Sequence, residues 1–147
     1  MDFVSPAQRA CYERVAGFLR ELYGERLLVD TTAPSFGLRS GSAWINVWVR
    51  PGPSTGPVVT IRAWLVTGTD PTPDFLHHLL SEPARPVFGA YGLDASGDVY
   101  LEHSLLGEGV TLDQVRASVE SVAAEADRAD DRIVARFGGI RMTDQRV

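Results

Sequence analysis

The amino-acid sequence predicts an α+β domain in which helices pack on an antiparallel sheet, and three observations predict it. Residues 112–137 repeat apolar side chains at steps of three and four, which indicates one long amphipathic helix. Residues 42–50 and 58–66 alternate strictly between two sets of side chains, which is typical of strands. Short loops join neighbouring strands, which favours antiparallel pairing. The expected order is α-β-β-β-α-β-β-α, with the two long terminal helices on one face of the sheet.

The long C-terminal helix has clear start and stop signals. Thr111 and Gln114 have the spacing of a capping box, and Gly138 and Gly139 favour the end of the helix. Its length of about 26 residues corresponds to roughly 39 Å at 1.5 Å per residue. Its apolar stripe consists of Leu112, Val115, Val119, Val122, Ala126, Ala129, Ile133 and Phe137.

The N-terminal helix begins at Ser5 and Pro6, and Gln8 completes the pattern of a second capping box. Its apolar face consists of Cys11, Val15, Phe18, Leu19 and Leu22, and Gly24 ends it. The sequence then predicts a short strand over residues 27–32, which residues 36–39 extend or restart.

The middle of the chain alternates hairpins with one short helix. Residues 51–56 form the loop between strands 42–50 and 58–66. Thr72 and Pro73 open the short helix. Two further strands, over residues 86–93 and 98–105, follow it and lead into the long helix. Residues 1–147 are expected to form one domain, with a core over about 6–139 and a frayed tail over 140–147.

Composition narrows the function classes. The chain has 147 residues, of which 44% are hydrophobic and 22% charged, as in an ordinary soluble domain. Its net charge of −5, without a basic run, argues against nucleic acid as a partner. No apolar run is long enough to span a membrane, and no signal peptide is visible. The single cysteine, Cys11, excludes an internal disulfide, so we expect a cytoplasmic location.

One face of the predicted sheet collects all three tryptophans. Side chains of a strand alternate between faces, so those of Trp44, Asn46 and Trp48 lie opposite the small aliphatic set that suits the helices. The candidate partner or dimer surface consists of Trp44, Trp48, Trp64, Arg50, Arg62 and Tyr100. Tryptophan and arginine are enriched at binding hot spots. Three interpretations stay open: coverage by the short second helix or neighbouring side chains, a homodimer interface, or a site for another ligand.

The sequence offers no constellation for catalysis. His77 and His78 are adjacent on a helix and point about 100° apart, so they cannot chelate one ion. His103 is expected at the edge of the core. The acidic cluster of Asp127, Asp130 and Asp131 is interpreted as a solvated helix face. We therefore predict no catalytic residue, no metal and no cofactor, and we expect that the protein is not an enzyme.

Three stretches carry a resemblance to a known family: RSGSAWINVWV, PVFGAYGLDASGDVYLEHSLLG and TLDQVRASVESVAAEADRADDRIVARFGG. They resemble the YbjN-like family of actinobacteria, a branch of the type III secretion chaperone-like superfamily, over roughly residues 6–139. The resemblance implies a small acidic α+β domain, often homodimeric, that binds an extended peptide of a partner protein as a chaperone or adaptor. It transfers no binding residue. The alternative is a regulatory or scaffold domain without chaperone activity, and a small hydrolase-like enzyme is a remote one.

Overall fold

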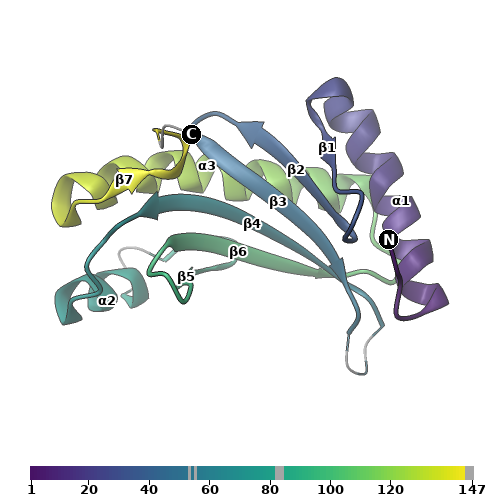
Figure 1. Cartoon of the computed structure of the whole chain (residues 1–147), viewed down its shortest axis with the longest axis horizontal. Coiled ribbons are helices and arrows are strands. Elements are labelled where there is room, and N and C mark those ends of the chain that lie inside the picture. Colours follow the sequence, from purple (N-terminus) through teal and green to yellow (C-terminus); the bar gives the residue numbers. More distant parts are fainter. Residues whose placement is uncertain (53, 55, 82–84, 145–147) are drawn as a thin grey trace.

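The computed structural model describes residues 1–52, 54, 56–81 and 85–144, and it has one twisted antiparallel sheet with helices on one of its faces (Figure 1). The helices are α1 (Pro6–Tyr23), α2 (Pro73–Leu80) and α3 (Leu112–Phe137), with short 3₁₀ turns η1 (Gly24–Arg26) and η3 (Met142–Asp144). The strands are β1 (Leu28–Val29), β2 (Ser35–Ser40), β3 (Ala43–Arg50), β4 (Val58–Thr67), β5 (Ala90–Leu93), β6 (Val99–Leu106) and β7 (Ile140–Arg141). Their order across the sheet is β1-β2-β3-β4-β6-β5, and β7 also pairs with β4.

The predicted fold class is confirmed. Of the two possibilities for residues 36–39, the structure shows that they restart a strand: β1 and β2 are separate and are joined by a turn that Asp30 organises. Its Oδ1 accepts the backbone N–H groups of Thr32 at 2.7 Å and Ala33 at 3.1 Å, and its Oδ2 accepts the Ser35 hydroxyl at 3.1 Å. These hydrogen bonds lower the pKa of Asp30 to about 2. The turn lets β1 fold back on β2.

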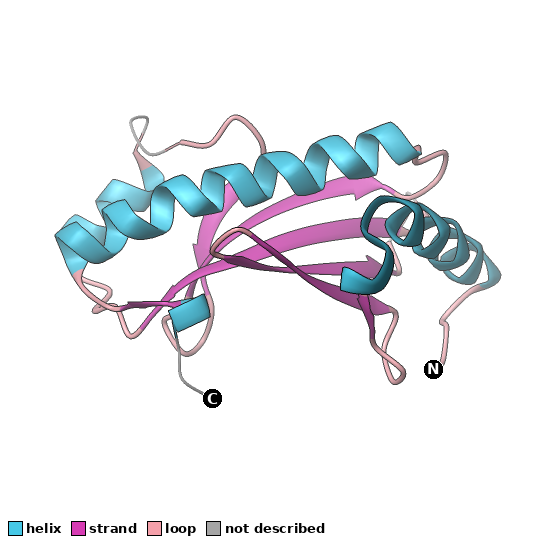
Figure 2. Ribbon diagram, turned by 90° about the horizontal axis from the view of Figure 1, so that it is seen from above, coloured by secondary structure: helices cyan, strands magenta, loops and turns pink. Residues whose placement is uncertain are grey.

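The core lies between the sheet and the two long helices. Figure 2 shows α3 running along one side of the sheet, with α1 at one end of it. Val15 of α1, Ile45 and Ile61 of the sheet, and Val122 of α3 are all 0% exposed. These positions follow the predicted apolar faces of strands and helices. Within the described residues, no helix is both long enough and apolar enough to cross a bilayer.

Gln8 is buried in α1 and does more than cap it. The Ser5 hydroxyl accepts the Gln8 N–H at 3.1 Å, as the sequence predicts. The Gln8 amide does not return to Ser5: its oxygen accepts the Val4 N–H, and its Nε2 donates to the Val49 carbonyl, both at 2.8 Å. The predicted capping box is therefore only half formed, because the amide serves to dock α1 on β3.

Helix α3 has the predicted ends. Gln114 N–H donates to the Thr111 hydroxyl at 3.3 Å, and Thr111 N–H donates to the Gln114 amide oxygen at 3.0 Å, which completes the capping box. Gly138 ends the helix with φ +77°. The acidic cluster is not wholly a solvated helix face as predicted: Asp127 and Asp131 are exposed, but Asp130 is only 2% exposed. It is buried because the β2–β3 turn packs against this part of the helix.

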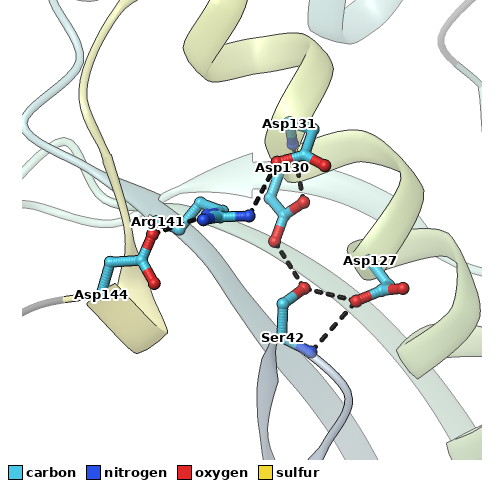
Figure 3. A network of polar contacts seen from close by, with 6 residues as sticks. All are labelled: Ser42, Asp127, Asp130, Asp131, Arg141 and Asp144. Atoms are coloured by element: carbon cyan, nitrogen blue, oxygen red, sulfur yellow. Dashed lines mark hydrogen bonds and ion pairs between the residues drawn. The ribbon is translucent and has the colours of Figure 1, made fainter.

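Figure 3 shows the polar network that holds this turn to α3. Ser42 N–H donates to Asp127 Oδ1 at 3.0 Å, and the Ser42 hydroxyl lies 2.5 Å from the same oxygen. The hydroxyl also lies 2.8 Å from Asp130 Oδ2. Desolvation raises the pKa of Asp130, whereas the bonds from Ser42 lower the pKa of Asp127.

The prediction of a frayed tail is wrong for residues 140–144. Ile140 and Arg141 pair with Thr67 and Val66 at the end of β4. The Arg141 guanidinium forms ion pairs with Asp131 at 2.9 Å and with Asp144 at 2.7 Å (Figure 3). The sequence pattern missed this segment because a two-residue strand has no periodicity. Residues 145–147 of the predicted tail, and residues 53 and 55 of the predicted hairpin loop, lie outside the described residues.

Candidate functional site

The six candidate residues share the face of the sheet that lies opposite the helices. Register places Trp44 of β3 beside Trp64 of β4, which is in turn beside Tyr100 of β6. Trp48 lies farther along β3, opposite Thr60. We call this surface the aromatic face; its members are Trp44, Trp48, Trp64, Tyr100, Arg50 and Arg62. The three tryptophans and Tyr100 are half-buried.

Helix α2 does not cover the aromatic face, so coverage by this helix is excluded, whereas neighbouring side chains do pack against the rings. Phe75 of α2 is fully buried, and its ring centroid lies 4.8 Å from that of Phe137 on α3. In Figure 1, α3 runs behind the sheet. Helix α2 therefore packs on the helical side of the molecule. The aromatic side chains are shielded mainly by one another and by η3, which contacts β3 and β4.

Arg62 lies at the centre of the aromatic face. Its guanidinium carbon lies 3.9 Å from the Tyr100 ring centroid and 5.1 Å from that of Trp64. A third ring, that of Trp48, lies 5.4 Å away. Arg62 also donates to Glu102, its cross-strand neighbour, from Nε at 2.8 Å and from Nη2 at 2.5 Å. The charge of Arg62 is thus already paired, and its guanidinium holds the rings in position.

Further contacts fix the orientation of the rings. Trp64 Nε1–H donates to Asn46 Oδ1 at 3.0 Å, so the polar edge of the indole is satisfied. The Trp64 and Tyr100 rings meet edge to face, with centroids 5.7 Å apart. These contacts hold the Trp64 and Tyr100 rings in a defined orientation.

Two glycines let rings lie flat across neighbouring strands. A Cβ added at Gly37 of β2 would lie 2.8 Å from Cζ2 of Trp44. A Cβ added at Gly92 of β5 would lie 2.5 Å from Cζ of Tyr100. Side chains at these two positions would displace the rings, so glycine extends the flat surface beyond β3, β4 and β6. Sequence reasoning treated neither glycine as part of the site.

Arg50 forms one end of the aromatic face. It is exposed, and its guanidinium carbon lies 5.1 Å from the Trp48 ring centroid. Within the described part of the chain it has no ion-pair partner, which distinguishes it from Arg62. Its cross-strand neighbour Val58 is apolar. Arg50 is therefore the cation of this surface that is available to an incoming group.

A hollow of about 260 Å³ lies at the other end of the aromatic face. Its lining combines two indoles with polar and charged groups: Trp44, Asn46, Trp64, Asp94, Asp98 and Met142. The β5–β6 turn supplies Asp94 and Asp98, and η3 supplies Met142. Sequence reasoning missed these three residues. In the sequence the two aspartates are typical of a turn, and Met142 belongs to the segment that is expected to fray.

The histidines lie apart from this surface. His78 packs on Phe137, with ring centroids 5.1 Å apart, and burial is the largest cause of its lowered pKa. His103 contacts Phe88, and burial lowers its pKa as well. In the described ranges, no three His, Cys, Asp or Glu side chains are grouped so that they could hold a metal ion. The absence of a catalytic role stays a prediction.

Comparison with solved structures identifies proteins of the same fold. The HopA1–SchA chaperone–effector complex contains a chain with a TM-score of 0.62 and 15% identity, covering 88% of this chain and 99% of that one. A chain of the ExsC–ExsE complex gives a TM-score of 0.52 at 16% identity, over 89% and 96%. The Yersinia pestis type III secretion chaperone SycH, in complex with a stable fragment of YscM2, gives a TM-score of 0.50 at 18% identity, over 79% of this chain and 96% of that one. At these identities the likeness shows the fold.

Comparison of the sequence with curated proteins found no match. A family model, in contrast, matches residues 10–145. Its description is "T3SS (YopN, CesT) and YbjN peptide-binding chaperone 1", which agrees with the resemblance found from the sequence. The match covers every described strand of the sheet and all three α-helices except the start of α1. The chain therefore belongs to the family of type III secretion and YbjN peptide-binding chaperones, TY-Chap1.

Proposed function

We propose that this protein is a non-enzymatic peptide-binding module that acts as a chaperone or adaptor, and that it holds an extended, partly apolar segment of a partner protein on the aromatic face. The family description and the chaperone complexes among the similar structures support a peptide ligand. One observation on this chain carries the choice of site: Trp44, Trp48 and Trp64 converge, half-buried, on the side of the sheet that faces away from α1, α2 and α3 (Figure 1).

The physical basis is the amount of flat aromatic surface that binding would remove from water. Large apolar patches on a soluble protein mark interaction sites. Tryptophan, tyrosine and arginine dominate binding energies because they combine apolar area with polar contacts. An extended peptide could place alternate side chains on the rings while its other side chains stay in solvent.

Tryptophan fluorescence tests the proposal with an extended model peptide that carries leucine and phenylalanine at alternate positions. Binding should shift the emission, and Trp64→Ala should weaken the affinity by more than about 1 kcal/mol, or roughly fivefold, if the ring is an anchor. Phe88→Ala is the matched control, because Phe88 is 47% exposed and lies on the helical side of the sheet against His103. Trp48→Ala provides a second variant if Trp64→Ala lowers the melting temperature. Equal affinities for Trp64→Ala, Trp48→Ala and Phe88→Ala would refute the site.

We also propose a homodimer, and we place its contact at two strongly exposed apolar side chains. Leu80 of α2 is 82% exposed and Val87 is 89% exposed. They lie close to β5, an edge strand of the sheet. The sequence also leaves the aromatic face, which includes Trp48, open as a dimer surface. Light scattering separates the two: Leu80→Asp should give a monomer while Trp48→Asp keeps the dimer, since a buried unpaired charge is unfavourable. A monomeric wild type would exclude both.

We also propose a cytoplasmic location. The buried thiol of Cys11 is the chain's only cysteine, and a reducing compartment suits a protein without disulfides. Fractionation of cells that express the tagged protein tests this location, and recovery from a secreted or membrane fraction would contradict it.

A further inference from the structure

The hollow at the Trp44 end of the aromatic face is lined by two carboxylates, which are held by hydrogen bonds from the β5–β6 turn and from the end of β4. Asp94 Oδ1 accepts the N–H groups of Ser96 at 2.8 Å and of Asp98 at 2.9 Å. Asp98 Oδ1 accepts the Thr67 hydroxyl at 2.5 Å. Each of these bonds uses Oδ1. Within the described residues neither aspartate has an ion-pair partner, although both line the hollow beside Trp44 and Trp64.

Aromatic rings beside carboxylates form a suitable environment for a cation. An arginine or lysine side chain is attracted by the face of an indole, and this attraction adds to that of the carboxylates. Two cations of the chain lie near this end: Arg62 contacts the Trp64 ring but is paired with Glu102, and Arg39 lies opposite Trp44 on β2. Arg39 is exposed, and its Nε donates to the Gly41 carbonyl at 3.4 Å, so it is drawn toward the β2–β3 turn. It does not line the hollow.

The opposite end of the aromatic face has the opposite sign of charge. Arg50 is exposed there above Trp48. Between the two ends, the Arg62–Glu102 pair is internally neutralised. The surface is therefore acidic at the hollow, apolar and neutral in the middle, and basic at Arg50. Trp44, which lines the hollow, and Arg50 are six positions apart on β3, or about 20 Å at roughly 3.3 Å per residue. Register places Asp98 beyond the row of Trp44, Trp64 and Tyr100, so six residues is the shortest spacing that joins the two ends.

From this charge distribution we infer that the aromatic face selects an extended segment carrying a basic and an acidic side chain about six residues apart. The basic side chain enters the hollow beside Asp94 and Asp98, the acidic one pairs with Arg50, and apolar side chains between them contact Trp64 and Trp48. This inference rests on the proposed function and adds the sequence class of the ligand. The spacing matters because an extended segment also advances about 3.3 Å per residue.

Four synthetic peptides with one common apolar sequence test the charges separately. The first carries arginine and glutamate six residues apart; in the others glutamine replaces the arginine, the glutamate or both. Each charge should tighten binding to the wild type by about fivefold, the equivalent of about 1 kcal/mol for a partly exposed pair. Both gains should shrink at high salt. In a fifth peptide the two charges are two residues apart, so only one of them can reach its partner on the face. The affinity gain from the other charge should then be lost.

Isosteric variants assign each gain to its end of the face. The double variant Asp94→Asn with Asp98→Asn keeps the accepting oxygens of the turn, and it should abolish only the gain from arginine. Arg50→Gln should abolish only the gain from glutamate. Equal affinities for the four peptides, or gains that these variants leave unchanged, would overturn the inference. If the charges make no difference but the peptides bind more weakly to the Trp64→Ala variant than to the wild type, the inference fails and the proposed function stands. If no peptide binds, or if Trp64→Ala changes nothing, both fail.

Discussion

Replacing Ser42 by alanine should destabilise the protein strongly for a residue in a surface turn. Its hydroxyl lies within hydrogen-bond distance of both Asp127 and Asp130, and Asp130 is only 2% exposed. Removing a partner from a buried polar group costs about 1–3 kcal/mol. For a chain of this length, each kcal/mol lowers the melting temperature by about 2–4 °C.

The same network predicts two opposite pH dependences. The Ser42 hydroxyl has one proton and lies within donating distance of both carboxylates, so it donates to Asp127 or to Asp130 but not to both at once. Burial raises the pKa of Asp130 in the folded protein above that in the unfolded chain. The Asp130 side chain therefore contributes fully to stability below its ordinary pKa, and this contribution is lost as the pH rises through the raised pKa. The pKa of Asp127 is lowered, so its contribution exists above its ordinary pKa and is lost in acid.

Two isosteric variants separate these effects. Asp130→Asn keeps a donor to Ser42 without a buried charge, so its stability relative to wild type should increase as the pH rises above about 4. Asp127→Asn should show the reverse. Urea unfolding from pH 4 to 8 measures both, with thermal melts for Ser42→Ala. The reasoning would be refuted if Ser42→Ala unfolded within 0.5 kcal/mol of wild type, a difference of about the size of ordinary surface substitutions, or if Asp130→Asn were less stable at pH 7.

Three further predictions concern the fold. Val122→Asp should unfold the domain because Val122 is 0% exposed, whereas Glu120→Ala on the exposed side of α3 should cost about 0–1 kcal/mol; equal melting temperatures would show that the stripe is misplaced. Gly139→Ala should detach β7, because Gly139 has φ +88° and an added Cβ would lie 2.7 Å from the Thr67 carbonyl oxygen; unchanged amide-exchange protection at residues 140 and 141 would contradict this. Asp30→Ala should destabilise the protein at neutral pH, and its difference from wild type should narrow as the pH falls through about 2, as acid titration of both proteins would reveal.

The sequence by itself determined the helices, most strands and the shared face of the tryptophans, because these depend on local periodicity. The capping residues Thr111 and Gln114 and the stripe that includes Val122 specify α3 without reference to the rest of the chain. Strand parity alone places Trp44 and Trp48 on one face, since successive side chains must alternate.

Only the tertiary structure decided what surrounds that face, because those contacts join segments that are distant in the sequence. Parity could not show that α2 packs on α3 through Phe75 and leaves the tryptophans uncovered. Pairing of β7 with β4 brings Met142 to the hollow, although nothing in the tail is periodic. Burial of Asp130 depends on where the β2–β3 turn meets α3. The sequence places side chains on a face, whereas the packing of distant segments determines their partners and their charge state.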